Sequence, residues 1–352
     1  MKVAIITDTH HGVKNNSNII HDLYRRYYSE VFFPYLVDNN IKILFHLGDL
    51  VDVRHHITGL TLNRLRADFL DPLNDIVDEA HFLIGNHDCV YKNTLTPNYV
   101  SELLSKYNNN KKFIVHDKPS TRVFNKKKID FVPWICSSNK EEIDDFIKKS
   151  KSSVLLGHFE FSGFLMYKNQ MARSGISTKG LQKYHTVLSG HYHTRSTQDN
   201  ISYLGCPLDI TWADYDDPKG FHVMDLNTLE LEFIRNPIEL HREIIYNDLI
   251  NIEETLESCK DKIVRVICKE DYKPYEFQLF LDKLSKISLD YKISDYTKVV
   301  SLDESIDIHD PKVIDLLDIF KKSIGINDED ELLNIRINEI LTDIYNEAIR
   351  LK

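Results

Sequence analysis

Short apolar runs alternate with helical patterns over about the first 235 residues of the chain. Each run is rich in Val, Ile, Leu or Phe and ends at a polar residue or a glycine, as buried central strands do. The runs are Val3–Ile6, Ile43–Leu47, Phe82–Ile84, Val154–Leu156 and Val187–Leu188. Between the runs, apolar residues recur at helical spacing over residues 20–35, 60–77 and 99–107. This alternation predicts an α/β layered architecture.

The sequence pattern in the later part of this region is typical of β-hairpins. Its strand candidates are residues 113–115, 121–124, 129–132, 201–204, 221–225 and 229–234. We expect Lys126–Lys128 at the top of a hairpin turn, where lysines serve solubility or touch a DNA backbone. With the five apolar runs, these segments predict two packed β-sheets with helices outside them.

The pattern breaks at Asn236-Pro237, so we place the first domain at residues 1–237. Residues 238–302 are expected to form a small α+β capping domain. Its expected elements are strands at 263–268, 291–293 and 298–301 and a helix at 275–287. Residues 303–352 carry two amphipathic helical stripes, which pack either on the main domain or on a partner protein.

The charge distribution changes what the net charge implies about partners. The formal charge of the 352 residues is −10, which by itself argues against a nucleic-acid binder. Residues 301–352 contain 13 Asp and Glu against 6 Lys and Arg, so residues 1–300 carry only −3. The acidity is concentrated in the tail and says little about the surface of the main domain.

Composition also bounds the location of the protein. No apolar run approaches the ~20 residues of a membrane span, and the apolar start of the chain is too short for the core of a signal peptide. The five cysteines are scattered and form no C-x-x-C pair, which disfavours a disulfide framework and a structural zinc knuckle. We expect a soluble, cytoplasmic protein with reduced thiols and no membrane partner.

Residue types that bind metals follow each of the five apolar runs. In chain order they are Asp8, His10, Asp49, Asn86, His158, His191 and His193. Ligand sites in α/β sheets form outside the carboxyl ends of strands, so we expect these side chains to converge on one crevice. A single D-x-H or H-x-H tripeptide is weak evidence. The series of five, each at the end of a predicted strand, carries the prediction.

The set of donors indicates how many ions the crevice holds. Seven carboxylate, imidazole and amide ligands without a thiolate suit Mn, Fe or Zn and exceed what one catalytic ion needs. They are natural for two ions about 3.5–4 Å apart that share a bridging carboxylate, as in two-metal phosphoryl-transfer sites. Asp49 is best placed for the bridge, because it lies on a tight turn between the others.

The motifs form a series, D-x-H, G-D-x-x-D, G-N-H-D, G-H and G-H-x-H, that starts at Asp8, Gly48, Gly85, Gly157 and Gly190. This series resembles the calcineurin-like metallophosphoesterase superfamily. Within it, the chain is similar to the SbcD-type nuclease subunits of recombination-repair complexes, in particular their T-even phage branch. The closer features include Val132–Trp134, Tyr203–Pro207 and Asp217–Phe221. The resemblance covers about residues 1–235 and rests beyond them on organisation only.

The resemblance implies two ion sites that share one ligand. The first ion would be held by Asp8, His10, Asp49 and His193. The second would be held by Asp49, Asn86, His158 and His191. Manganese is the expected metal, with iron, zinc and magnesium as alternatives, and a water made acidic by the ions would attack the DNA phosphorus.

Two further residues receive catalytic roles from the resemblance. His87 would contact the phosphate and protonate, or stabilise charge on, the leaving oxygen. Asp52 stands where some members have a histidine and where phosphatases of the superfamily have aspartate. It either orients His87, as carboxylates orient imidazoles generally, or is a solvated turn carboxylate.

The implied function is that of a two-metal DNA phosphodiesterase, acting as 3′-to-5′ exonuclease and single-strand endonuclease in DNA recombination and repair. The implied partners are DNA, an SMC-like ABC-type ATPase of the SbcC kind docked on the C-terminal helices, and a second copy bound through helices at about 17–39 and 56–78. The location would be the host cytoplasm if a phage encodes the chain.

Two other functions compete with this one. The same metal site would serve a phosphatase or cyclic-nucleotide phosphodiesterase acting on small esters, although the cap and tail are superfluous for such substrates. A scaffold that keeps the fold without catalysis is disfavoured, because all seven ligand types are present.

Overall fold

The computed structural model describes residues 1–295 except 53–55, 106, 108–111, 169, 248–249 and 270. The chain divides into two compact units, Met1–Ser294 and Asp295–Lys352, and the description concerns the first. The expected strand at 298–301 and the expected helices in 303–352 lie outside the described residues.

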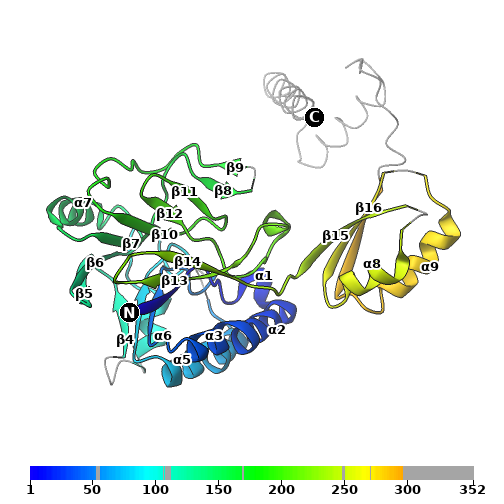
Figure 1. The fold of residues 1–352 in the computed structure, drawn as a ribbon, viewed down its shortest axis with the longest axis horizontal. Coiled ribbons are helices and arrows are strands. Elements are labelled where there is room, and N and C mark those ends of the chain that lie inside the picture. The colour runs from blue at the N-terminus through cyan, green and yellow to red at the C-terminus, as the bar shows by residue number, and fades with distance from the viewer. Residues whose placement is uncertain are drawn as a thin grey trace, which may run out of the picture. The chain divides into compact units, whose positions relative to one another are not determined.

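Two six-stranded β-sheets dominate the part of the chain that the structure describes (Figure 1). The first, in spatial order, consists of β14 (Leu231–Arg235), β13 (Gly220–Asp225), β1 (Lys2–Ile6), β2 (Ile43–His46), β3 (Glu79–Leu83) and β4 (Phe113–His116). The second consists of β11 (Ser196–Gln198), β12 (Ile201–Tyr203), β10 (Thr186–Gly190), β7 (Val154–His158), β6 (Lys127–Val132) and β5 (Ser120–Phe124). Strands β1 to β4 are mutually parallel, as are β6, β7, β10 and β12. Each parallel group therefore presents its carboxyl ends along one edge.

The alternation of side chains along β1 explains how the sheets are layered. Val3 and Ile5 point to one face and join a buried cluster with Phe131 and Leu156 of the second sheet. Ala4 and the other alternate residues point to the opposite face, into a cluster with the helices that cover it. The predicted arrangement of two packed sheets with helices outside is confirmed.

The helices that cover the first sheet are longer than any one label suggests, because α-helical and π-helical stretches follow each other directly. They are α2 (Asn18–Arg26), η1 (Tyr27–Phe32), α3 (Phe33–Asp38), α4 (Gly59–Arg64), η2 (Leu65–Leu70), α5 (Asp71–Ile76) and α6 (Tyr99–Leu104). The short segment α1 (Val13–Asn16) before them is a turn with positive φ at Lys14 and Asn15 and has no buried residue. The sequence predicts helices here but not the two π-helical stretches. Pro34 and Pro72 follow those stretches closely, and a proline has no N–H for the regular i→i−4 hydrogen bond.

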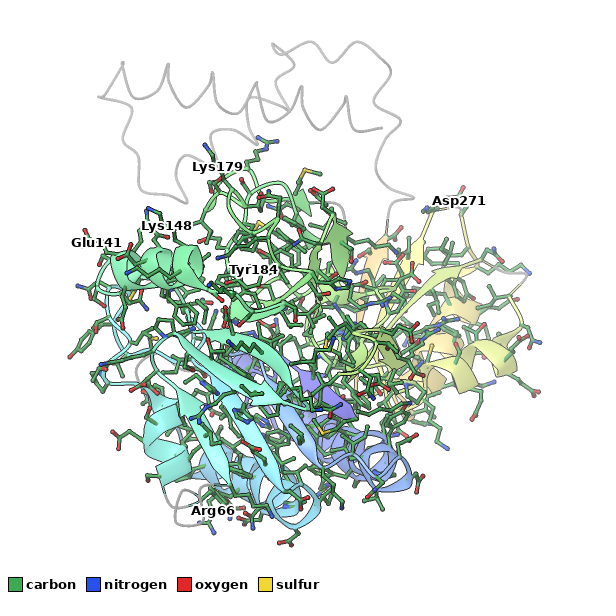
Figure 2. All side chains as sticks on the ribbon, turned by 60° about the vertical axis from the view of Figure 1, so that its left-hand side comes forward. Arg66, Glu141, Lys148, Lys179, Tyr184 and Asp271 are labelled. Carbon is green, nitrogen blue, oxygen red and sulfur yellow. The ribbon has the colours of Figure 1, made fainter. Side chains whose placement is uncertain are left out.

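The outer face of the second sheet is covered by α7 (Lys140–Lys149). Ile143 of this helix is buried with Leu155 and Phe159, while Glu141 and Lys148 lie on its outer side (Figure 2). The turn between β5 and β6 is made by Asn125 and Lys126, both with positive φ, so the lysine run lies partly inside β6 instead of wholly in the turn.

A three-stranded sheet follows the strands of the two large sheets in the chain. It has the order β15-β16-β17, from β15 (His241–Tyr246), β16 (Ile263–Cys268) and β17 (Asp290–Asp295), with α8 (Ile252–Cys259) and α9 (Pro274–Leu284). These elements share their own buried cluster, which includes Val266, Phe280 and Leu284. The sequence predicts β16, α9 and β17 but misses β15 and α8. The domain boundaries at 237 and 302 stay predictions.

Two observations concern expectations about location. All five cysteines are buried, and none of them forms a disulfide bond. Among the described helices, none combines the length and apolar character that crossing a bilayer requires.

Candidate metal centre

The predicted ligands lie at the carboxyl edges of the two sheets, six of them in loops after strands and His158 at the last position of β7. Asp8 and His10 follow β1, Asp49 follows β2, and His191 follows β10. All four have positive φ values, between 43° and 91°, which non-glycine residues rarely adopt. Such conformations persist only where the surroundings fix them, and they cluster at functional sites. Here they turn each side chain sharply off its strand.

One group of donors consists of Asp8, His10 and His193, whose ligand atoms lie close together. The Nε2 atoms of His10 and His193 face each other at 3.0 Å. Oδ1 of Asp8 lies 3.8 Å from Nε2 of His10. The structure thus brings together residues separated by 183 positions in the chain.

A second group consists of Asn86, His158 and His191. Oδ1 of Asn86 lies 3.1 Å from Nε2 of His158 and 2.9 Å from Nδ1 of His191. Asp49 joins the two groups, because its Oδ2 is 3.3 Å from Nε2 of His158 and 3.6 Å from Nε2 of His10. All seven side chains singled out from the sequence therefore meet at one place, with Asp49 between the two groups.

The chemistry of these donors fits divalent cations. Asp8 and Asp49 are buried carboxylates, and buried carboxylates are found paired with cations or metals. The imidazole nitrogens face the same space as the carboxylate oxygens, and no thiolate is among them. This oxygen and nitrogen set suits Mn, Fe and Zn alike.

The carboxylates make the centre strongly favourable for positive charge. Burial would lower the pKa of His10, but its hydrogen bond to Asp52 and the charges of Asp49 and Asp8 raise it to about 9. Burial likewise opposes the protonated form of His158, whose pKa the carboxylate of Asp49 raises to about 9. The raised pKa values of both imidazoles show that the carboxylates favour positive charge at this place.

Asp88 fixes the backbone of two ligand loops at once. Its carboxylate accepts hydrogen bonds from the N–H groups of Asp49 (2.8 Å), Val51 (3.0 Å) and Gly85 (2.8 Å). Burial, together with the charge of Asp49, raises the pKa of Asp88 to about 6. In the sequence, Asp88 is only the last residue of the G-N-H-D motif, since nothing local indicates that its carboxylate binds the backbone of another loop.

Glycine is required where these loops touch. A Cβ on Gly85 would lie 2.1 Å from Oδ1 of Asp49, and a Cβ on Gly48 would lie 2.5 Å from Nδ1 of His158. Gly48 also has a φ of 101°, which side chains rarely tolerate. Close packing around Asp49 and His158 thus explains the glycines at positions 48 and 85.

His87 and Asp52 lie at the open side of the centre. Oδ1 of Asp52 is 3.0 Å from Nδ1 of His87 and 3.2 Å from Nδ1 of His10. The His87 side chain is 33% exposed and that of Asp52 25%, so both are accessible. Burial opposes ionisation of Asp52, but the hydrogen bonds from His10 and His87 hold its pKa well below the usual range.

Backbone and aromatic groups also contact the histidines of the predicted ligand set. Nδ1 of His158 lies 2.8 Å from the carbonyl oxygen of Leu47, and the backbone N–H of His191 donates to both carboxylate oxygens of Asp8 at 3.1 and 3.0 Å. The centroid of the Trp134 ring lies 5.1 Å from the centroid of the His191 ring. These contacts fix the ring orientations that metal binding requires.

Known proteins resemble this chain in sequence and, more weakly, in structure. A family model described as calcineurin-like phosphoesterase matches residues 1–195. Exonuclease subunit 1 of Enterobacteria phage T4 is 39% identical over 246 residues, which are 70% of this chain and 71% of that protein.

Solved structures align at low identity. A dimetal phosphatase from Danio rerio aligns over 68% of this chain and 97% of its own, with 12% identity and a TM-score of 0.42. An archaeal phosphodiesterase aligns over 67% of this chain and 100% of its own, with 16% identity and a TM-score of 0.35. These scores carry no argument about activity, whereas the two sequence matches do identify the family. The chain belongs to the calcineurin-like phosphoesterase family.

Proposed function

We propose that this protein is a metal-dependent nuclease that hydrolyses phosphodiester bonds in DNA. Family membership supports a phosphoesterase, and the name of the phage T4 relative, an exonuclease subunit, supports DNA as the substrate. The observation that carries the proposal is the convergence of seven donors with Asp49 between their two groups.

Two cations, manganese first among the candidates, would be held by these donors. Asp8, His10 and His193 would hold one ion, and Asn86, His158 and His191 the other, with Asp49 shared. When bound, such ions supply Lewis-acid stabilisation of a phosphoryl group and lower the pKa of a water molecule.

The protein's own residues would handle the leaving group. His87 is partly exposed beside the centre, and its backbone N–H donates to Oδ1 of Asp49 at 2.8 Å, so its ring is placed next to the donors without having to be one of them. Asp52 accepts from Nδ1 of His87, which leaves Nε2 as the nitrogen that would donate to a phosphate or leaving oxygen. Asp52 would thereby orient His87 and fix its tautomer, and the same carboxylate would orient His10.

The expected reactions are 3′-to-5′ exonuclease and single-strand endonuclease cleavage. We further propose that the protein acts with an SMC-like ABC-type ATPase. The phage T4 relative is named a subunit, which supports a partner protein. The acidic segment 303–352 of this chain has two apolar stripes that a partner would bury. A homodimer through the helices α2 to α5 belongs to the same proposal.

A comparison of hydrolysis rates on four substrates tests the proposal directly. The purified full chain with Mn²⁺ would be given linear duplex DNA, single-stranded DNA, a chromogenic phosphate diester and a chromogenic monoester. A nuclease cleaves DNA and the diester and leaves the monoester almost intact. Rapid monoester hydrolysis with intact DNA would instead identify a phosphatase, and no hydrolysis of any substrate would identify a scaffold.

A further inference from the structure

We infer that Asp214 and Lys219 position His193 for cation binding, an inference that rests on the proposed metal centre. His193 directs Nε2 toward His10, while its other ring nitrogen, Nδ1, is buried and has no hydrogen-bond partner among the described residues. Oδ1 of Asp214 lies 3.9 Å from this nitrogen. Histidines that bind a metal through one nitrogen generally donate the other N–H to a carboxylate or carbonyl oxygen. Asp214 is placed to be that acceptor.

The carboxylate of Asp214 is held by its own surroundings. It is almost fully buried at the end of η4 (Trp212–Asp214). Its Oδ2 accepts hydrogen bonds from the backbone N–H of Thr211 at 3.0 Å and from the Thr211 hydroxyl at 2.8 Å. These bonds hold Oδ2, and Oδ1 is the carboxylate oxygen that faces His193.

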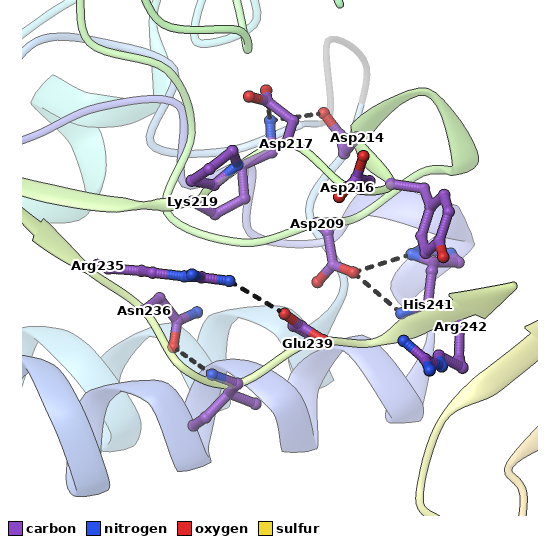
Figure 3. Close-up of a pocket in the computed structure, with 13 residues that line it drawn as sticks. Asp209, Asp214, Asp216, Asp217, Lys219, Arg235, Asn236, Glu239, His241 and Arg242 are labelled. Atoms are coloured by element: carbon purple, nitrogen blue, oxygen red, sulfur yellow. Dashed lines mark hydrogen bonds and ion pairs between the residues drawn. The ribbon is translucent and has the colours of Figure 1, made fainter. Parts of the chain in front are cut away.

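Lys219 connects this carboxylate to the backbone of His193. Its side chain is only 5% exposed, and Nζ lies 3.0 Å from Oδ1 of Asp214 and 2.8 Å from Oδ2 of Asp217 (Figure 3). The same ammonium group donates to the carbonyl oxygen of His193 at 2.8 Å. One buried cation therefore fixes the distance between the histidine and its carboxylate, and balances the charge of Asp214.

The turn at Gly205 and Cys206 also contacts the carbonyl oxygen of His193. The backbone N–H of Cys206 donates to it at 3.2 Å, and a Cβ on Gly205, whose φ is 71°, would lie 2.9 Å from it. The segments Tyr203–Pro207 and Asp217–Phe221, which the sequence marks without giving them a role, thus meet at His193. Their shared task is to hold this ligand from behind.

Calorimetric titration of the metal-free full chain with Mn²⁺ tests the inference. Asp214→Asn removes the charge and keeps the shape, and is expected to weaken binding at the site that contains His193 by about 10–100-fold. The other binding event should stay unchanged. The matched control is Asp216→Asn in the same loop, because the exposed carboxylate of Asp216 pairs with Lys168 at the surface. An Asp214→Asn isotherm equal to that of the unaltered protein, or an equal loss in the control, would overturn the inference.

A second measurement needs no substitution, so it stands even if Asp214→Asn does not fold. Nitrogen-15 spectra of the Zn²⁺-loaded protein report which ring nitrogen of His193 binds the ion. The expected result is binding through Nε2 and a slowly exchanging proton on Nδ1. Binding through Nδ1, or a freely exchanging Nδ1 proton, would overturn the inference.

The outcomes separate the inference from the proposed function. Protein that binds Mn²⁺ more weakly after Asp214→Asn but never cleaves DNA would refute the nuclease proposal alone. Protein that cleaves DNA and is indifferent to Asp214→Asn would refute the positioning role alone.

Discussion

Imidazole nitrogens 3.0 Å apart, as in His10 and His193, need a proton or a cation between them, because two lone pairs at that distance repel. The buried carboxylates of Asp8 and Asp49 draw positive charge to the same place. At the scale of single residues, the centre is therefore a set of donors that surround a place for positive charge, supplied by protons or by bound cations. Residues near the donors that are not themselves donors are the candidates for chemistry.

His87 is the first such residue, and we predict that His87→Ala abolishes DNA cleavage while both ions stay bound. Loss of a general acid costs about 10²–10⁴-fold in rate. The measurement pairs single-turnover cleavage with calorimetric Mn²⁺ titration. Loss of one binding event in the variant would show that His87 is a ligand.

Asp52→Asn is expected to lower cleavage by about 10–100-fold, because the amide no longer holds His87 and His10 by charge. Asp22→Asn provides a control on the surface, where this carboxylate pairs with Arg25. Turnover on a short oligonucleotide at saturating Mn²⁺ measures both. Unchanged turnover in Asp52→Asn would mean that Asp52 is only a solvated turn residue.

At the scale of elements, the site depends on loops that touch through glycine. Asp88 ties the loops after β2 and β3 together, and Gly85 lets Asp49 approach. Neither helix propensity nor strand propensity enters here. The loops are held by hydrogen bonds and close contact alone.

Gly85→Ala is therefore predicted to weaken Mn²⁺ binding and to cost about 1–3 kcal/mol of stability, since the added methyl group meets Asp49. Gly59→Ala is the control, because a Cβ there meets nothing within 4 Å and Gly59 begins a helix. The Gly59→Ala change should raise stability by about 0.4–1 kcal/mol, because alanine restricts the unfolded chain more than glycine does. Chemical unfolding with and without Mn²⁺ compares the two, and equal behaviour would contradict the prediction.

The strands β3 and β4 also carry a buried pair of histidines. Nδ1 of His81 lies 2.8 Å from Nε2 of His116, whose ring stacks on Phe131. Burial lowers the pKa of His81 to about 2 and that of His116 to about 3. The unfolded chain, with histidine pKa values near 6.5, therefore binds more protons below pH 6.5.

It follows that this pair contributes stability that is complete above about pH 6.5 and is lost as pH falls toward 3. We predict that His116→Gln reduces the slope of unfolding free energy against pH by about 1.4 kcal/mol per pH unit between pH 6 and 4. Urea unfolding over that range measures the slope. An identical slope in the variant would refute the account of this pair.

How far the elements follow from sequence depends on whether the cause is local. The apolar runs ending in ligand residues predict β1, β2, β3, β7 and β10 and the seven donors that follow or end them, because hydrophobic period and chain direction are local properties. The roles of Asp88, Asp214 and Lys219 depend on which distant loop each side chain meets, and no spacing in the sequence encodes that. β15 was missed because Arg242 and Glu243 interrupt its apolar residues.

At the scale of the whole molecule, charge is unevenly distributed along the chain. Residues 303–352 carry −7 of the net charge of −10, and the seven predicted donors lie within the first 193 residues. The order of strands in the two sheets could not be predicted from sequence, since every pairing buries similar apolar runs. Only the direction of each strand mattered for the site, which is why the donors could be predicted without the topology.

Removal of residues 306–352 is expected to abolish association with an ATPase partner and to leave intrinsic Mn²⁺-dependent cleavage in place. The physical reason is that all the donors lie outside the removed segment. Co-purification and cleavage assays on the truncated chain measure the two properties. Unchanged partner binding would show that the tail serves another purpose.

The central claim is that two cations share Asp49. Anomalous diffraction at the manganese absorption edge from crystals grown with Mn²⁺ tests it most directly. The account predicts two anomalous peaks, about 3.5–4 Å apart, each within coordination distance of a carboxylate oxygen of Asp49. A single peak, or two peaks with Asp49 bound to neither, would contradict it.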